Sequence, residues 1–261
     1  MNASLDYCWT KIDRANENIE SLDVEANAFI DSGLYEFVLD GYVHNRTKKY
    51  AQWGVASVKD VSPRFSVLAG EIIHHLRSSL DLLVFQLVRR NTGADPINAA
   101  VSEFPVLTKN PGAKGTKTYE KVFGTKVKGV SSTAETQLES MQPYHLQEPT
   151  ESLLYVVHDL NRIDKHRLLL AMISVLDIVE QPEWPPSLIR AIGSTPYALR
   201  PGAKLYGFCA VGDVEPNVKD DFVADITFVE KGAVQGKPVI PALRELSKFV
   251  SDSVNSFSRE F

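Results

Sequence analysis

Apolar side chains recur with helical spacing in four parts of the chain, and each recurrence predicts an amphipathic helix. The predicted helices cover residues 4–31, 65–90, 151–169 and 241–258. Ser32-Gly33 and Asn91-Thr-Gly follow the first two, as expected at helix C-termini. Pro63 and Pro241 stand where helices commonly begin.

Segments rich in β-branched and aromatic residues lie between these helices and predict strands. Tyr35–Gly41 and Tyr50–Val58 would form a hairpin around residues 44–49. A sheet-rich part at 171–230 should add four strands, at 171–179, 187–192, 204–211 and 222–229. No composition break resembles a linker, so residues 1–261 are predicted to form a single domain. The expected class is α+β, with long amphipathic helices packed on one face of a mostly antiparallel sheet.

The stretch from residue 94 to residue 150 has little periodicity. Between residues 108 and 129 it holds six lysines, four glycines and one acidic residue. Such a composition buries too little apolar surface to offset the entropy of ordering, so we predict a mobile, loosely packed insert at about 108–129. A short helix should follow it, because Ser132 and Glu135 have the spacing of a capping box.

The helix predicted at 65–90 has an apolar face and a polar face. The apolar face is formed by Ile72, Ile73, Leu76, Leu80, Leu83, Val84 and Leu87. The polar face carries Glu71, His74, His75, Ser78 and Asp81. Leu82 and Phe85 lie within the polar face, so another segment should cover part of it, and Arg77 lies at the edge of the apolar stripe. Covered charges need partners.

Glu71 and His74 have the spacing of one half of a di-iron carboxylate site. Such a site needs a second Glu-x-x-His motif and further glutamates, and the chain has no second copy. We therefore expect no metal, and hydrogen-bonded histidines are the favoured reading.

The helix predicted at 151–169 carries charges inside its apolar arc. Asp164 falls near the centre of the arc, Arg167 falls within it and Asn161 lies on its edge, whereas Lys165 and His166 take the other side. Charges at such positions either neutralise one another in buried ion pairs or line a pocket, and ion pairs are the commoner case.

The two charged helices are therefore predicted to pack against each other. All four charges on or beside the apolar arcs would need opposite partners. The specific expectation is that Arg77 or Asp81 pairs with Asp164 or Arg167.

Both helices resemble the signature helices of an uncharacterised family of bacterial proteins. In that family the first helix reads like H-N-L-R-S-A-L-D-H-L and the second like N-x-x-D-K-H-R, with F-P and L-Q-P-Y motifs between them. The matching residues here are His74, Leu76, Arg77, Ser78, Leu80, Asp81, Phe104, Pro105, Gln142, Pro143, Tyr144, Asn161, Asp164, Lys165, His166 and Arg167. The chain departs from the pattern at His75 and Leu82. The family implies no activity, so the resemblance adds weight to these residues without naming a reaction.

Composition narrows the classes of function. The formal net charge of -5 argues against bulk attraction to nucleic acid or an anionic membrane. Neither a signal peptide nor a run of about 20 apolar residues is visible, so a soluble cytoplasmic protein without a membrane partner is expected. Cys8 and Cys209 fit two reduced thiols. No nucleotide-binding, zinc-protease or serine-hydrolase motif occurs, so no cofactor is expected.

The first hypothesis of function is a non-catalytic binding or assembly module with a buried charged network between two helices. Its polar cluster comprises His74, Arg77, Ser78, Asp81, Asn161, Asp164, Lys165 and Arg167. The apolar seam of the helix at 4–31 would mediate homo-oligomer formation. Nucleic acid is a further partner to consider, through the lysines at 108–129, but it is not favoured.

The alternative is a metal-independent endoribonuclease. It rests on a distant resemblance to HEPN-type helical ribonucleases, which place an arginine and a histidine on one helix, as Arg162 and His166 approximately do here. In this reading His166 is the general base or acid, and Arg77 or Arg167 stabilises the developing phosphate charge.

Overall fold

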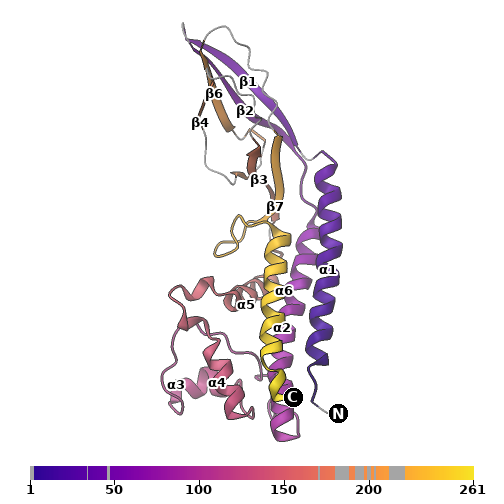
Figure 1. Cartoon of the computed structure of the whole chain (residues 1–261), viewed down its shortest axis with the longest axis vertical. Helices are drawn as coiled ribbons and strands as arrows, with labels where there is room; N and C mark the ends of the chain where they lie inside the picture. Colours follow the sequence, from indigo (N-terminus) through magenta and orange to yellow (C-terminus); the bar gives the residue numbers. More distant parts are fainter. Residues whose placement is uncertain are drawn as a thin grey trace.

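The computed structural model describes residues 3–33, 35–45, 48–169, 171–179, 188–191, 197–198, 201–202, 204–211 and 221–261. Three long helices run side by side, and the strands continue beyond one end of this bundle (Figure 1). The bundle consists of α1 (Asp6–Asp31), α2 (Pro63–Thr92) and α6 (Val239–Ser256). The molecule is therefore elongated along the helix axes.

Helix α2 begins and ends with the signals present in its sequence. The Ser62 hydroxyl accepts a hydrogen bond from the Arg64 backbone N–H at 3.3 Å, and Pro63 occupies the first turn. Gly93 closes the helix with φ 73°, in the left-handed conformation that glycine adopts without strain. Arg89 and Arg90 in the last turn complement the negative end of the helix dipole.

Each bundle helix buries one apolar stripe against the other two. The largest contributions come from Ile12, Ile19, Leu22, Ile72, Ile73, Leu76, Leu80, Leu83, Leu243, Leu246, Val250, Val254 and Phe257. Two polar residues of α1 that interrupt its seam have partners on α6. The Asn16 side chain accepts a bond from Ser247 at 2.6 Å, and Asp23 lies 2.8 Å from Arg244. The seam of α1 is thus occupied within the chain, whereas its expected role was self-association.

A lobe of short helices lies beside α2. It contains α3 (Lys117–Tyr119), the π-turn η1 (Glu120–Gly124), α4 (Ser132–Ser140), the 3-10 turns η2 (Pro143–His145) and η3 (Pro149–Glu151), and α5 (Leu153–Asp164). A further 3-10 turn, η4 (Ser258–Glu260), follows α6. Helix α5 is shorter than the predicted 151–169, because residues 165–167 form a turn.

The prediction of a loosely packed insert is wrong for its second half. Tyr119, Phe123 and Val127 are buried in the main apolar core, at a spacing of four residues. The helix cap after the insert also differs from the prediction, because Ser131 and not Ser132 accepts the bond from the Ala134 N–H. Three apolar side chains therefore anchor this stretch, although lysine and glycine dominate its composition.

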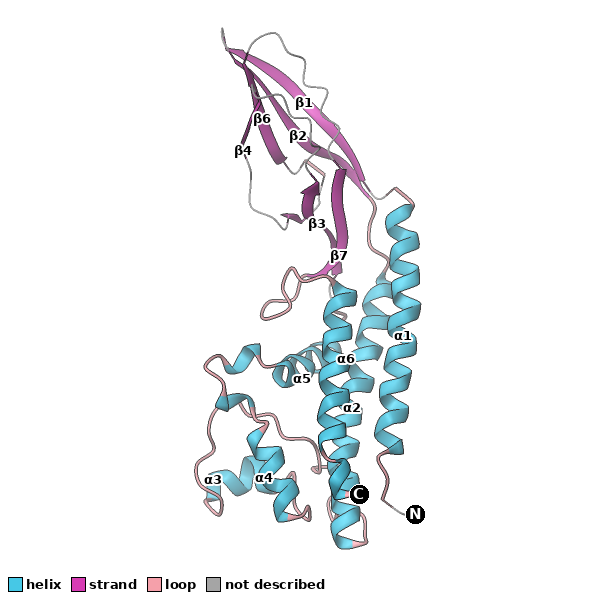
Figure 2. Cartoon of the chain, viewed as in Figure 1, coloured by secondary structure: helices cyan, strands magenta, loops and turns pink. Residues whose placement is uncertain are grey.

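The strands form two antiparallel sheets beyond the bundle (Figure 2). One sheet has the order β1-β2-β6-β4 and the other the order β5-β3-β7. Their bounds are β1 (Tyr35–Asn45), β2 (Lys48–Val58), β3 (Ala171–Val179), β4 (Leu188–Ala191), β5 (Tyr197–Ala198), β6 (Lys204–Val211) and β7 (Asp221–Phe228). The predicted hairpin of β1 and β2 forms, although residues 46 and 47 at its turn lie outside the described residues. Part of the strand predicted at 187–192 also lies outside them.

The predicted α+β architecture, with helices packed on one face of a sheet, is wrong. The long helices pack against one another, and the core is mostly helical. Among the described residues, the helices meet the strands mainly where the ends of α1 and α6 contact β7. The physical reason is that each helix finds a complementary apolar stripe on two other helices, so no sheet is needed to cover it.

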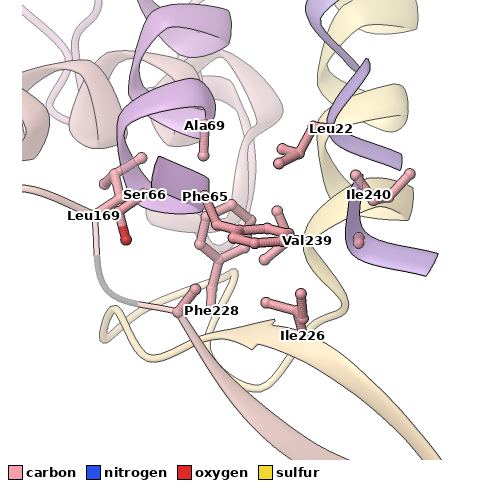
Figure 3. A pocket seen from close by; sticks show the side chains of 11 residues that line it. Leu22, Phe65, Ser66, Ala69, Leu169, Ile226, Phe228, Val239 and Ile240 are labelled. Carbon is pink, nitrogen blue, oxygen red and sulfur yellow. The ribbon is translucent and has the colours of Figure 1, made fainter. Parts of the chain in front are cut away.

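An apolar joint connects the bundle to the strands. Figure 3 shows side chains of α1, α2 and α6 converging with Ile226 and Phe228 of β7 on a small cavity. The cavity measures about 10 Å³, which is at most the space of one water molecule. Apart from Ser66 its lining is apolar, so it is a packing gap and not a ligand site. Within the described part of the chain, no helix is both long and apolar enough to cross a bilayer.

Candidate functional site

The two charged helices, α2 and α5, pack against each other as predicted. Gly70 of α2 leaves room for the Asp164 side chain of α5, since a Cβ at that position would overlap the Asp164 carboxylate. Burial raises the pKa of Asp164, the nearby His74 opposes this rise, and Glu71 adds to it. Asp164 therefore rests directly on the backbone of α2, in a place that only glycine leaves open.

Arg77 and Asp81 of α2 together hold the backbone of Phe104. The Arg77 side chain is 5% exposed, and its Nη2 donates to the Phe104 carbonyl at 2.7 Å. The same Nη2 lies 2.7 Å from Asp81 Oδ1, which accepts a bond from the Phe104 N–H at 3.0 Å. An ion pair at i,i+4 thus binds both polar groups of one peptide residue, and we call this arrangement the Phe104 clamp.

Gln142 holds the residues that follow Phe104. Its Nε2 donates to the Pro105 carbonyl at 3.0 Å, and its Oε1 accepts from the Leu107 N–H at 3.0 Å. The Tyr144 N–H donates to the Leu107 carbonyl at 3.1 Å. The Arg/Asp motif of α2, the Phe104-Pro105 motif and the Gln142-Pro-Tyr144 motif are therefore parts of one hydrogen-bonded unit.

Further charges surround the clamp. Glu103 lies 3.9 Å from Arg77 and 2.7 Å from Lys126. Burial alone would raise the pKa of Glu103, but the bond from Lys126 together with the charges of Lys126, Arg77 and His158 outweighs burial and lowers the pKa. Burial also raises the pKa of Asp81 against the pull of Arg77. The pKa of His158 is lowered by burial and by the charges of Arg77 and Lys126.

The predicted ion pairs between the two helices do not form as expected. Arg77 pairs with Asp81 of its own helix. Arg167 binds Glu230, in the turn after β7, through two parallel bonds of 2.9 and 2.7 Å. Glu230 is 3% exposed, so Arg167 neutralises a buried carboxylate that periodicity could not reveal. The opposite charges thus come from the same helix for Arg77 and from a turn for Arg167, and neither comes from the facing helix.

The remaining predicted residues lie around this region. His74 is exposed, and Ser78, 3.5 Å from it, is half-buried. Lys165 is exposed and acts electrostatically on Asp81. Asn161 is buried, and its Oδ1 has no hydrogen-bond partner among the described residues. The predicted polar cluster is thus divided between the Phe104 clamp, the α2–α5 contact and the Arg167–Glu230 pair.

His166 lies elsewhere. It is exposed and lines a groove with Arg162, Arg167 and Lys231, and Arg77 does not line this groove. The structure therefore brings His166 and Arg167 together but leaves Arg77 in the Phe104 clamp. Among the described residues, no group of three metal-ligating side chains is assembled.

Sequence reasoning missed three residues of the charged region: Glu103, Lys126 and Glu230. All three lie in loops or turns, where no periodicity points to them. One usable signal was the position of Glu103 directly before the Phe104-Pro105 motif. His158 and Arg77 each carry a buried nitrogen without a partner in the described part of the chain, which marks an incompletely satisfied polar contact.

Comparison with known proteins adds no relative. No protein-family model, no curated protein and no solved structure gives a significant match to this chain. The resemblance to an uncharacterised bacterial family therefore stays a prediction carried by the motifs alone.

Proposed function

We propose that the chain is a non-catalytic binding or assembly module, in which the charged residues of α2 and α5 hold its segments together. The observation that carries this proposal is the Phe104 clamp. Arg77 donates a hydrogen bond to the Phe104 carbonyl, and Asp81 accepts one from the Phe104 N–H. Arg167 donates two N–H groups to Glu230. Bonds of this kind hold segments of the same chain together.

The same geometry weighs against the ribonuclease alternative in the form that needs Arg77. A residue that stabilises a transition state must touch the reacting group. The Arg77 guanidinium is buried under the 103–104 segment, whereas His166 faces solvent in a different groove. An RNA bound at His166 would therefore not be stabilised by Arg77.

The test uses purified full-length protein and a labelled single-stranded RNA, with and without chelator. The proposal expects the RNA to stay intact in every condition. Cleavage by the wild type that disappears in His166→Ala would overturn it in favour of the ribonuclease. His145→Ala is a matched control, because His145 is also exposed but contacts Glu139 and does not line the groove of His166.

A further inference from the structure

A groove of about 510 Å³ lies between α5 and the turn that follows β7. The loop between β7 and α6 extends from the end of the bundle toward α5 (Figure 1), and Arg167 joins the two through Glu230. The groove is lined by Arg162, His166, Arg167 and Lys231, with Ile163 and Val229 as apolar neighbours. Two elements far apart in the sequence thus gather basic side chains around one depression.

Both arginines of the groove are held in place by carboxylates. Arg162 donates from Nε and Nη2 to Asp159 at 3.0 and 2.6 Å. Arg167 donates from Nη1 and Nη2 to Glu230 at 2.9 and 2.7 Å. A guanidinium has five N–H groups, so each arginine keeps about three for another acceptor. Their side chains are also 59% and 54% exposed, so these groups are accessible from solvent.

The charge of the groove is positive on a chain whose net charge is -5. Asp159 and Glu230 balance the two arginines, so among the described residues that line the groove the charge of Lys231 is in excess, and His166 lines the same groove. The groove lies at the C-terminal end of α5, the negative end of the helix dipole, so the basic side chains must supply the attraction for an anion. The backbone N–H groups of residues 165–167 bond there to the carbonyls of Asn161 and Ile163.

We propose that this groove binds a phosphate-bearing anion, for which inorganic tripolyphosphate is the simplest example. Preorganised guanidinium groups match the oxygen geometry of phosphate, and a lysine adds a mobile charge. A volume of about 510 Å³ is in the range of small-ligand sites. No Phe, Tyr or Trp is among the described residues that line the groove, so we expect the phosphates to carry most of the recognition. The inference rests on the proposed binding function and gives it a ligand class.

The test is a titration of the full chain with tripolyphosphate at low salt, in which calorimetry measures the heat of binding. The groove variant is Arg162→Gln with Lys231→Gln, which leaves Arg167 on its buried partner. The control variant is Arg14→Gln with Lys248→Gln, which removes two exposed charges from α1 and α6. The wild type and the control should bind alike, and the groove variant should bind about tenfold more weakly or worse. No binding by the wild type, or equal affinity of both variants, would overturn the proposal.

A second arm distinguishes the two sources of phosphate. A short labelled single-stranded RNA is titrated into the same three proteins. Groove-dependent binding of RNA without binding of tripolyphosphate would replace the small anion with a nucleic-acid backbone and overturn the proposal. Cleavage of that RNA would instead contradict the non-catalytic function, so the two failures are separate observations.

Discussion

Removing the Asp81 carboxylate should unfasten the segment at residues 103–107. In Asp81→Ala the buried Arg77 guanidinium loses its nearest charge, and the Phe104 N–H loses its acceptor. A hydrogen bond to a charged group contributes about 1.5–3 kcal/mol, and orphaning a fully buried charge costs about 3–5 kcal/mol. The Asp81 side chain is 34% exposed, so solvent screens part of this loss. We expect a loss of about 2–4 kcal/mol in the free energy of unfolding.

Asp81→Asn separates geometry from charge. The asparagine keeps an oxygen for the Phe104 N–H and removes only the charge that faces Arg77. Because burial already raises the pKa of Asp81, the charged form is disfavoured here, and the neutral isostere should cost about half as much as alanine. Asp252→Ala is the control, since Asp252 forms an exposed i,i+4 pair with Lys248 and should change stability by about 0.5 kcal/mol or less.

The assay is urea unfolding followed by circular dichroism, in the wild-type and Arg77→Met backgrounds. In the second background Asp81→Ala should cost less, because there is no guanidinium left to orphan. The reasoning is refuted if Asp81→Ala behaves like Asp252→Ala, or if its cost is the same in both backgrounds.

Three further predictions use the same unfolding assay. Gly70→Ala should lower the free energy of unfolding, despite the better helix propensity of alanine. In an Asp164→Ala background the same substitution should raise it by about 1 kcal/mol. An effect of the same sign in both backgrounds would contradict the close contact. Arg167→Met should cost about 2–4 kcal/mol by leaving the buried Glu230 carboxylate without its arginine, and clearly less beside Glu230→Gln. His158 has a folded-state pKa below its unfolded value, so its contribution is present above about pH 6.5 and lost as the pH falls toward the folded pKa. His158→Gln should therefore lose less stability than the wild type between pH 7.5 and 5.5, and equal losses would argue against this assignment.

Helical periodicity in the sequence located the long helices well. Predicted and observed bounds of α1, α2 and α6 differ by about two residues at most ends, because each helix buries one stripe and the stripe determines the pattern. The strands at 171–179 and 204–211 coincide with β3 and β6. What covers each stripe is a different question. An apolar face looks the same in a sequence whether a helix or a sheet packs on it, so the architecture was predicted wrongly.

The candidate site was predictable in part for a similar reason. Arg77 and Asp81 stand out because charge interrupts an apolar pattern, and the structure places both in one clamp. Their partner, the backbone of Phe104, carries no side-chain signal. Glu230 follows a strand in a turn, where any polar residue would be unremarkable in the sequence. Phe123, in contrast, was visible at i,i+4 from Tyr119 and Val127 but was outweighed by the lysines around it.

The order of synthesis gives the bundle a particular vulnerability. Helices α1 and α2 emerge first, and α6, which completes their core, follows after about 150 further residues. At roughly 5–20 residues per second, the stripe that Leu243, Leu246 and Val250 later cover stays open for about 7–30 s. A nascent chain that is halted before residue 239 therefore exposes the apolar stripe that α6 would cover, and such a chain should be prone to aggregate.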